Sequence, residues 1–343
     1  MFFTIFVWIP IYGQNLVLGA ILGLSGASFY NGKAIQEGIE LALNELKNSS
    51  LKVIFEDYKQ SSNEAVKAFH TILLKKPKGI ITMSSTSSVP INPLATKHNI
   101  IQLAILSWAT SYSTPEDFSF RLDITTDSIA KEFCSFVERK RFTEIALVFI
   151  KTNFGTSMRD SVRKVCGDRI VFEYEYLESD KDINSLALKA IRSSPSLILV
   201  VDHRSSMIGD FVKRLRAFNY KGSIYSGTLG QDNLFLSTAG EFSEGTYYIY
   251  VASNEEKILE IYRKRYHNAP INPYLVSLGY EAVKILHSAF ESCSDTDCAR
   301  NKLYSSEFDT VFGKLKFDIN GDAVGIKPET RVIRNGKFEK ANF

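Results

Sequence analysis

Five consecutive hydroxyl residues, Ser84–Ser88, directly follow a short apolar run, Gly79–Met83. The apolar run is typical of a buried strand, and a helix is predicted over about Val89–Lys97. Hydroxyl and backbone N–H groups at a helix start can bind a carboxylate or another anion, helped by the helix dipole. Capping of the helix is the alternative, but it needs only one hydroxyl, so we favour an anion site. Pro90 and Pro93 are compatible with a helix start and leave its extent open.

Polar and aromatic residues also follow other predicted strands. Trp108, with a wide ring and one N–H donor, could line a ligand site, or could simply pack in the core. Phe154 and Tyr30 allow the same two interpretations, as ligand contacts or as packing residues of their loops. Asp202 could face a ligand, or it could pair locally with Arg204, as charges at strand ends often do.

These residues must be positioned by the elements between them. From Leu16 onward, short apolar runs alternate with amphipathic helices. The predicted strands are Leu16–Leu22, Val53–Asp57, Gly79–Met83, Ile100–Leu106, Phe118–Leu122, Glu144–Ile150, Arg169–Tyr176, Ser196–Val201, Ser223–Ser226 and Gly245–Val251. Strands that alternate with helices indicate parallel sheets covered on both faces, and the pattern restarts at Asp127. The sequence therefore predicts an α/β protein with two doubly wound, Rossmann-like lobes.

The remaining chain has a different pattern. Two helices are predicted over about Glu255–Tyr266 and Pro273–Phe290, and we assign them to the first lobe. Asp318 to Gly321 has the composition of a turn between two strands. Asn335-Gly336, between two short strand-like runs, predicts a β-hairpin.

The sequence resembles the type I periplasmic binding proteins, particularly the leucine/isoleucine/valine-binding branch. The resemblance covers nearly the whole chain after residue 14, and it rests on the order and spacing of several short pieces. These are Ser25-Gly26 with Tyr30-Asn31-Gly32, Ser84–Ser88, Trp108-Ala109-Thr110-Ser111, Phe120-Arg121, Asn153-Phe154-Gly155, Phe312-Gly313, Phe317-Asp318 and Asn320-Gly321-Asp322.

The resemblance implies two lobes joined by a three-strand hinge, with a ligand bound between them. The expected crossings lie near 122–125, 251–254 and 309–316. Lobe 1 would comprise 15–122 and 253–310, and lobe 2 would comprise 123–252 and 311–343. A ligand between the lobes agrees with the rule that ligands bind outside the carboxyl ends of parallel strands.

The resemblance also implies roles for individual residues. Ser85, with Thr86 beside it, corresponds to the serine that holds the ligand carboxylate. Ala109 and Thr110 would give a carbonyl and a hydroxyl to a ligand ammonium group. Tyr30 and Phe154 would cover the ligand from opposite lobes, with Trp108 as a further wall.

The second lobe departs from the family pattern. Leu229 lies at or near the position where amino-acid binders carry a carboxylate, and leucine cannot pair with an ammonium group. Asp232 is nearby, but it is a good candidate for a helix cap. Arg204 or Ser205 takes the place of an aromatic ligand contact. An amino acid is therefore expected only if Asp202 or Asp232 faces the ligand, and otherwise a carboxylate without an amine, or an amide.

Composition and the chain start indicate the surroundings of the protein. The formal net charge is only +3, and no basic stripe with interleaved aromatics occurs, so a nucleic-acid partner is not expected. Residues 1–14 are apolar and uncharged, which indicates a secretory signal with cleavage near Gly13. Because no Lys or Arg precedes this run, a buried first strand is the alternative. We expect a periplasmic or otherwise extracytoplasmic location.

The four cysteines allow three complete pairings. Cys293 and Cys298 are close enough for a small disulfide loop in an exported protein. Cys134 and Cys166 fall on two helices of the same lobe, and we interpret them as packed free thiols. Metal binding is not expected, because no histidine lies near a cysteine pair.

The function that the resemblance implies is substrate binding for an ABC importer. The partners would be a small amino acid, amide or carboxylate and a membrane permease, with the protein as a monomer and no cofactor. A sensory receptor of the same fold is the alternative. An α/β enzyme is less expected, because no dinucleotide or phosphate-loop motif and no nucleophile–base pair is found. A transcription regulator would need an N-terminal pair of DNA-binding helices, which we do not find.

Overall fold

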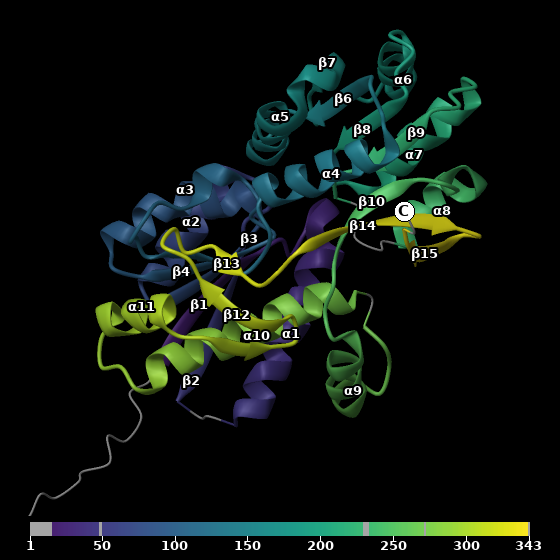
Figure 1. The fold of residues 1–343 in the computed structure, drawn as a ribbon. Helices are drawn as coiled ribbons and strands as arrows, with labels where there is room; N and C mark the ends of the chain where they lie inside the picture. Colours follow the sequence, from purple (N-terminus) through teal and green to yellow (C-terminus); the bar gives the residue numbers. More distant parts are fainter. Residues whose placement is uncertain (1–15, 48–49, 229–232, 271, 342–343) are drawn as a thin grey trace, which may run out of the picture.

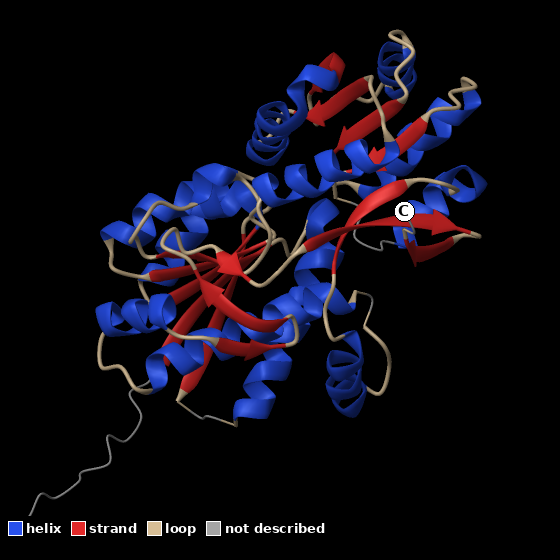
Figure 2. Cartoon of the chain, viewed as in Figure 1, coloured by secondary structure: helices blue, strands red, loops and turns tan. Residues whose placement is uncertain are grey.

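Two mostly parallel sheets, each covered by helices, divide the chain into two lobes (Figures 1 and 2). The structure is a computed structural model that describes residues 16–47, 50–228, 233–270 and 272–341. The predicted signal segment, residues 1–14, lies outside the described residues. The fold class predicted from the sequence, an α/β protein with two doubly wound lobes, is confirmed.

The first lobe is built on a five-stranded parallel sheet with strand order β2-β1-β3-β4-β5. Its strands are β1 (Leu16–Leu22), β2 (Leu51–Asp57), β3 (Gly79–Met83), β4 (Ile101–Ile105) and β5 (Ser119–Arg121). Its helices are α1 (Phe29–Leu46), α2 (Ser62–Leu73), α3 (Ser84–Lys97), α9 (Glu255–Tyr266), α10 (Pro273–Glu291) and α11 (Thr296–Ser305). The middle strands are buried over their whole length, which explains their continuous apolar runs.

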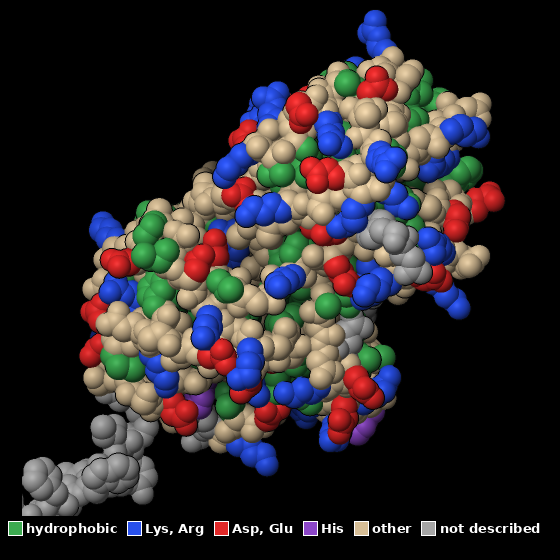
Figure 3. Space-filling view, in the orientation of Figure 1, with side chains coloured by type: hydrophobic (Ala, Val, Ile, Leu, Met, Phe, Trp, Pro, Cys, Tyr) green, Lys and Arg blue, Asp and Glu red, His purple; other side chains and the backbone are tan. Residues whose placement is uncertain are grey.

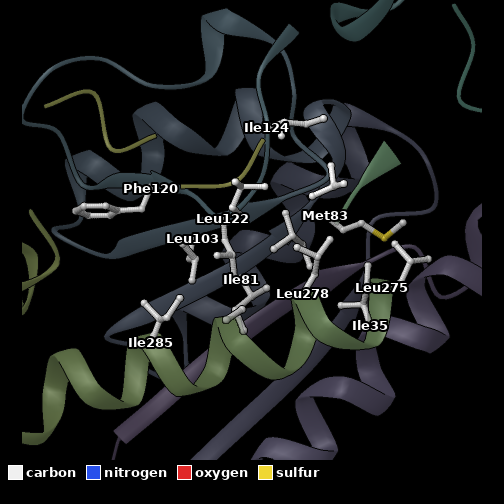
Figure 4. Close-up of a cluster of buried hydrophobic side chains, with 14 of the residues drawn as sticks. Ile35, Ile81, Met83, Leu103, Phe120, Leu122, Ile124, Leu275, Leu278 and Ile285 are labelled. Atoms are coloured by element: carbon white, nitrogen blue, oxygen red, sulfur yellow. The ribbon is translucent and has the colours of Figure 1, made fainter. Parts of the chain in front are cut away.

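Helices α1 and α10 cross at unusually close range on one face of this sheet. A Cβ atom on Gly38 would lie 2.0 Å from the Val276 carbonyl oxygen, and one on Gly279 would lie 2.1 Å from that of Ile35. Only glycine fits at these two positions. Figure 4 shows further side chains of α10, labelled Leu278 and Ile285, on the side of the helix that faces the sheet. Helix α10 thereby ties the C-terminal part of the chain into the first lobe.

The second lobe is built on a seven-stranded sheet with strand order β15-β14-β10-β9-β8-β6-β7. Its strands are β6 (Ile145–Ile150), β7 (Ile170–Tyr176), β8 (Leu197–Val201), β9 (Ser223–Ser226), β10 (Tyr247–Val251), β14 (Pro328–Arg334) and β15 (Lys337–Lys340). Its helices are α4 (Thr126–Lys140), α5 (Asn153–Cys166), α6 (Ile183–Ile191), α7 (Ser205–Ala217) and α8 (Asn233–Ala239). The predicted hairpin at Asn335-Gly336 is confirmed, since β14 and β15 pair antiparallel and both turn residues have positive φ.

The third crossing differs from the expected range 309–316. That range contains β11 (Phe308–Thr310) and most of β12 (Gly313–Phe317), which pair with each other. With β13 (Ala323–Val324) they form a separate three-stranded sheet, and the chain joins the large second sheet only at β14. The sequence indicates short strands here but not the sheet that they join, because strand pairing is decided by contacts between residues far apart in the chain.

A buried ion pair attaches this small sheet to the first lobe. The Arg121 side chain is fully buried at the end of β5, and its Nε atom lies 2.9 Å from Asp322 Oδ1. The Arg121 backbone N–H also donates to the Gly321 carbonyl oxygen at 2.8 Å. Two sequence pieces that carried the family resemblance therefore contact each other directly, and removing one partner would leave a buried charge unpaired.

A second buried carboxylate lies on the first crossing, residues 122–125. Asp123 accepts hydrogen bonds from the backbone N–H groups of Leu106 and Ile124, at 3.0 and 2.8 Å, and from the Tyr274 hydroxyl at 2.7 Å. Burial raises the pKa of Asp123, although these donors oppose the rise. Tyr274 belongs to α10, so the crossing is fixed to the first lobe from two sides.

A third buried carboxylate, Glu281 of α10, holds the second crossing. Its Oε1 atom accepts the Val311 N–H at 2.8 Å, and the Val311 carbonyl oxygen accepts the Asn254 N–H at 2.6 Å. Burial raises the pKa of Glu281 above its usual value. The folded protein therefore takes up a proton before the unfolded chain does as the pH falls, and this gain in stability is lost as the pH rises through the raised pKa.

We expect Glu281→Gln to raise the unfolding free energy, relative to the parent protein, more at pH 7 than at pH 4. The reason is that the amide oxygen still accepts the Val311 N–H but carries no buried charge. The change in unfolding free energy caused by the substitution should differ between the two pH values by about 1.4 kcal/mol for each unit by which the pKa is raised. Urea unfolding at both pH values measures this. Glu291→Gln, on an exposed residue of the same helix, is the control. An equal effect at both pH values would contradict the prediction.

Both pairs of cysteines form disulfides. The expected Cys293–Cys298 loop is present, and Cys134 is bonded to Cys166, so the interpretation of these two as free thiols was wrong. The two cysteines lie on separate helices, and the sequence does not show that these helices bring them within bonding distance. The Cys134–Cys166 bond fixes α4 to α5, the two helices of the second lobe whose N-terminal ends approach the first lobe.

Replacing Cys134 and Cys166 together by alanine should lower the unfolding free energy by roughly 3–4 kcal/mol, since the bond closes a long loop. The same change at Cys293 and Cys298 should cost roughly 2 kcal/mol, because that loop is short. Chemical unfolding of both double variants, without reductant, measures the difference. A larger loss for the short loop would contradict the chain-entropy argument.

Within the described part of the chain, no helix is both long enough and apolar enough to cross a bilayer. On the face shown in Figure 3, basic and acidic side chains are mixed and form no continuous basic stripe.

Candidate functional site

The loops that follow the parallel strands of the two lobes meet between the sheets. In the first lobe they follow β3 and β4, and in the second lobe they follow β6 and β8. Helix α3 of the first lobe and α5 of the second lie against each other at this place (Figure 1). Most of the residues singled out from the sequence lie here.

Helix α3 begins at Ser84, so the expected hydroxyl-rich loop is the first turn of this helix. The prolines that limited the predicted helix lie inside it, at Pro90 and Pro93. Pro90 has no N–H to donate to the Thr86 carbonyl oxygen. The Ser62 hydroxyl donates to that oxygen instead, at 3.0 Å, and this side-chain bond allows the helix to continue through the proline.

Most of the five hydroxyls at this helix start serve the fold. Ser87 donates to the Met83 carbonyl oxygen, and Ser88 is bonded to Thr82 at 2.9 Å in a buried position. Ser84 donates to the Tyr58 hydroxyl at 3.2 Å. The number of hydroxyls at a helix start is therefore no measure of how many can bind a ligand, because the sequence does not show which side chains point inward.

The structure brings Ser85 and Ala109 together. The buried Ser85 hydroxyl oxygen accepts the Ala109 backbone N–H at 3.2 Å, which joins the loop after β3 to the loop after β4. The first-turn N–H groups of α3 and this hydroxyl thus lie next to Thr110 and Trp108. Their roles as ligand contacts stay predictions.

A chain of hydroxyl groups connects the two lobes. Thr110, in the first lobe, contacts Ser157 of α5 twice, since its backbone N–H lies 3.0 Å and its hydroxyl 3.1 Å from the Ser157 Oγ atom. The Ser157 Oγ atom also lies 2.8 Å from the hydroxyl of Thr126, which in turn bonds to Ser161. Sequence reasoning missed Ser157. The only signal was its position one helical turn after Phe154.

Aromatic rings meet beside this hydroxyl chain. The rings of Trp108 and Phe154 are edge to face, with 5.5 Å between their centroids, and both residues are partly buried. This contact joins the two lobes. Whether the rings are walls of a ligand site or packing residues stays open between the two interpretations. Tyr30 lies apart from it, with 66% of its surface exposed and its ring against Phe29 at 5.5 Å. Leu229, like Asp232, lies outside the described residues.

Asp202 and Arg204 form a local ion pair after β8. The Asp202 Oδ1 atom accepts from the Arg204 backbone N–H and Nε, at 2.7 and 3.0 Å, and its Oδ2 atom accepts from Arg204 Nη2 at 2.7 Å and from the Tyr176 hydroxyl. The Asp202 side chain has no exposed surface. The sequence left open whether Asp202 faces a ligand or pairs locally with Arg204, and in the structure it pairs with Arg204.

The charges of this pair affect its neighbours. Burial raises the pKa of the Tyr176 hydroxyl, and the adjacent Asp202 charge raises it further. Burial alone would lower the pKa of Arg204, but the hydrogen bonds and charge of Asp202 outweigh it and raise that pKa above its usual value. Tyr176 therefore stays a neutral donor and Arg204 stays charged. Among the described residues, no group of three or more His, Cys, Asp or Glu side chains is placed to hold a metal ion.

Ser157→Ala should loosen the contact between the lobes, because the Thr110 N–H and hydroxyl lose their partner. A net loss of about 1 kcal/mol would weaken the association of the two lobes roughly fivefold. Small-angle X-ray scattering of the ligand-free protein should then give a larger radius of gyration. Ser161→Ala is the matched control, since the Ser161 partners lie within the second lobe. Equal radii for both variants would contradict the prediction.

Comparison with known proteins identifies the family. The family model described as "Periplasmic binding protein" matches residues 16–328, and the chain belongs to this family. Its fold is that of the type I members of the leucine/isoleucine/valine-binding kind. None of the curated protein sequences compared with the chain matches it.

Solved structures show the same fold at low sequence identity. An extracellular ligand-binding receptor from Desulfohalobium retbaense has a TM-score of 0.85 and 22% identity, and the match covers 96% of this chain but only 60% of that one. The branched-chain amino acid transporter substrate-binding protein LivJ from Streptococcus pneumoniae, in complex with isoleucine, has a TM-score of 0.84 and 19% identity, with 95% and 98% covered. An ABC transporter solute-binding protein from R. palustris, in complex with benzoate, has a TM-score of 0.82 and 16% identity, with 95% of each chain covered.

Proposed function

We propose that this protein is an extracytoplasmic substrate-binding protein of an ABC importer, which binds a small amino acid, amide or carboxylate between its lobes. The observation that carries the proposal is the meeting of Ser85, Ala109 and Thr110 of one lobe with Phe154 and Ser157 of the other. Polar donors and aromatic walls converge there at the carboxyl ends of parallel strands, where ligands of open α/β folds bind. Family membership supports the same function.

The proposed mechanism is hinge closure. The ligand binds first to one lobe of an open form. Contacts with the second lobe, which exist only in the closed form, then stabilise the closed form relative to the open one. The three crossings are the hinge, and buried polar groups such as Asp123 and Glu281 fix each crossing to the first lobe. The Thr110–Ser157 contact would be exchanged for ligand contacts during this cycle, since both groups of Thr110 face that serine.

Location and partner follow from the same proposal. Two disulfides are typical of proteins that fold outside the reducing cytoplasm. The apolar segment 1–14 would direct export, and the closed form would dock on a membrane permease as a monomer. No enzymatic step is proposed, because the Ser157 hydroxyl contacts only Thr110 and Thr126 among the described residues, and neither can act as its base.

A thermal-shift screen tests the proposal on the whole chain. Amino acids, amides and aromatic carboxylates, including isoleucine and benzoate, would be added in large excess, and a bound ligand raises the melting temperature by mass action. At 100 times the dissociation constant the gain is about 2.7 kcal/mol. Turnover of a compound, with no stabilisation by any, would refute the binding function.

Ser85→Ala combined with Thr110→Ala should weaken binding of the stabilising compound at least tenfold, with both lobes still folded. Two lost hydrogen bonds to a charged ligand correspond to roughly 3 kcal/mol, or about a hundredfold. Isothermal titration calorimetry measures the affinity. Thr71→Ala is the control, since the exposed Thr71 hydroxyl bonds only within α2 to the Lys67 carbonyl oxygen. An unchanged affinity in the double variant would rule out this site.

A further inference from the structure

The Asp202 carboxylate has no acceptor position left for a ligand. A carboxylate offers about four such positions. Here they receive the Arg204 N–H, Nε and Nη2 donors and the Tyr176 hydroxyl. With no exposed surface, the Asp202 side chain is fixed in this arrangement. A ligand ammonium group that reached this place would find its carboxylate already occupied.

Unlike Asp202, Arg204 is not fully used by contacts within the protein, because an N–H donor remains available. A guanidinium group has five N–H donors. Two of them are directed to Asp202, and one from Nη1 goes to the Glu178 carbonyl oxygen at 3.0 Å. Arg204 also shares a side-chain hydrogen bond with Tyr176, so one of the five N–H donors then has no acceptor among the described residues. The side chain is 19% exposed and is held from both ends, so it is rigid, charged and still able to donate.

This group lies on the side of the second lobe that faces the first. Asp202 follows β8 and Glu178 follows β7, at the carboxyl ends of both strands. Helix α3 of the first lobe contacts α5 of the second, so the edges of the two sheets at which these strands end lie close together. Arg204 is therefore placed across from the predicted carboxylate site.

From these contacts we infer that the ligand presents an oxygen acceptor, and no ammonium group, to the second lobe. The class would be small carboxylates without an amine, in which a carbonyl or second carboxylate oxygen accepts from Arg204. Charge-assisted hydrogen bonds of this kind are roughly twice as strong as bonds between neutral groups. This inference rests on the proposed function. It selects one of the ligand classes that the function leaves open.

Among the described residues around Arg204, Glu178 is the carboxylate that could offer an ammonium group another partner. Its side chain is half exposed, and its Oε1 atom lies 3.5 Å from His203 Nε2. An exposed carboxylate in water gains little from pairing with an ammonium group. The positive charge of Arg204 beside it opposes such a ligand further.

Matched ligand pairs test the inference. 4-Methyl-2-oxopentanoate and leucine share a carbon skeleton and one carboxylate, and 2-oxoglutarate and glutamate share a carbon skeleton and two carboxylates. Each pair differs only in an oxo or an ammonium group. Calorimetry on the full chain at pH 7.5 should show at least tenfold tighter binding of one or both oxo acids than of the matching amino acid. Tighter binding of the amino acids, lost in Glu178→Gln, would overturn the inference and leave the proposed function intact.

Variants of the ion pair test the role of Arg204. Arg204→Gln alone leaves the buried Asp202 charge unpaired and could prevent folding. The double variant Asp202→Asn with Arg204→Gln removes both charges, and it should bind the oxo acid at least tenfold more weakly. The matched control is Glu173→Gln with Arg163→Gln, another carboxylate–arginine pair of the same lobe, whose Oε2 and Nε atoms lie 2.7 Å apart.

The two proposals fail in different ways. Oxo-acid binding that is unchanged in the folded Asp202–Arg204 double variant would overturn the role of Arg204. If no oxo acid, amino acid, amide or aromatic carboxylate stabilises the parent protein, the proposed function fails, and this inference fails with it.

Discussion

The direction of the parallel strands is the constraint on which the rest of the structure depends. Every strand of a parallel sheet ends at the same edge, and so the loops after β3 and β4 are neighbours, as are those after β6 and β8. The lobes are joined so that both of these edges come close together. Residues more than a hundred positions apart, such as Ser85 and Arg204, can therefore belong to one site. The helices mainly cover the apolar faces that this arrangement creates.

Buried charges at the crossings give this arrangement its definition. Asp123 and the Arg121–Asp322 pair lie where segments leave the first lobe, and both bond to that lobe. Glu281 lies within α10 of the first lobe and accepts the Val311 N–H of a crossing segment. Burying a charge is costly, and such groups are weak sources of stability. Their geometry is demanding, however, since a misplaced chain would leave a charge without a partner. We infer that these groups fix where the hinge begins, while apolar packing supplies most of the stability.

The interlobe contacts combine two kinds of interaction with different consequences. The Trp108–Phe154 ring contact is apolar and needs no precise partner, whereas the Thr110–Ser157 hydrogen bonds use the donors that a ligand would need. Ser157 satisfies groups of Thr110 that would otherwise lie unpaired between the lobes. Under the proposed function, a ligand would exchange with it, and affinity would depend on how much better the ligand accepts these hydrogen bonds than serine does.

The sequence by itself determined the alternation of strands and helices and the two lobes. Those features follow from local periodicity, turn composition and the polarity of parallel sheets, and each is expressed within a short stretch of chain. Tertiary structure alone decided the Cys134–Cys166 bond, the small sheet before β14, the closure of Asp202 by Arg204 and Tyr176, and the role of Ser157. In each of these cases the partners lie on different elements, and the direction of a side chain depends on how those elements pack. Helix α3 shows the same limit, because the Ser62 hydroxyl that allows the helix to run through Pro90 comes from another helix.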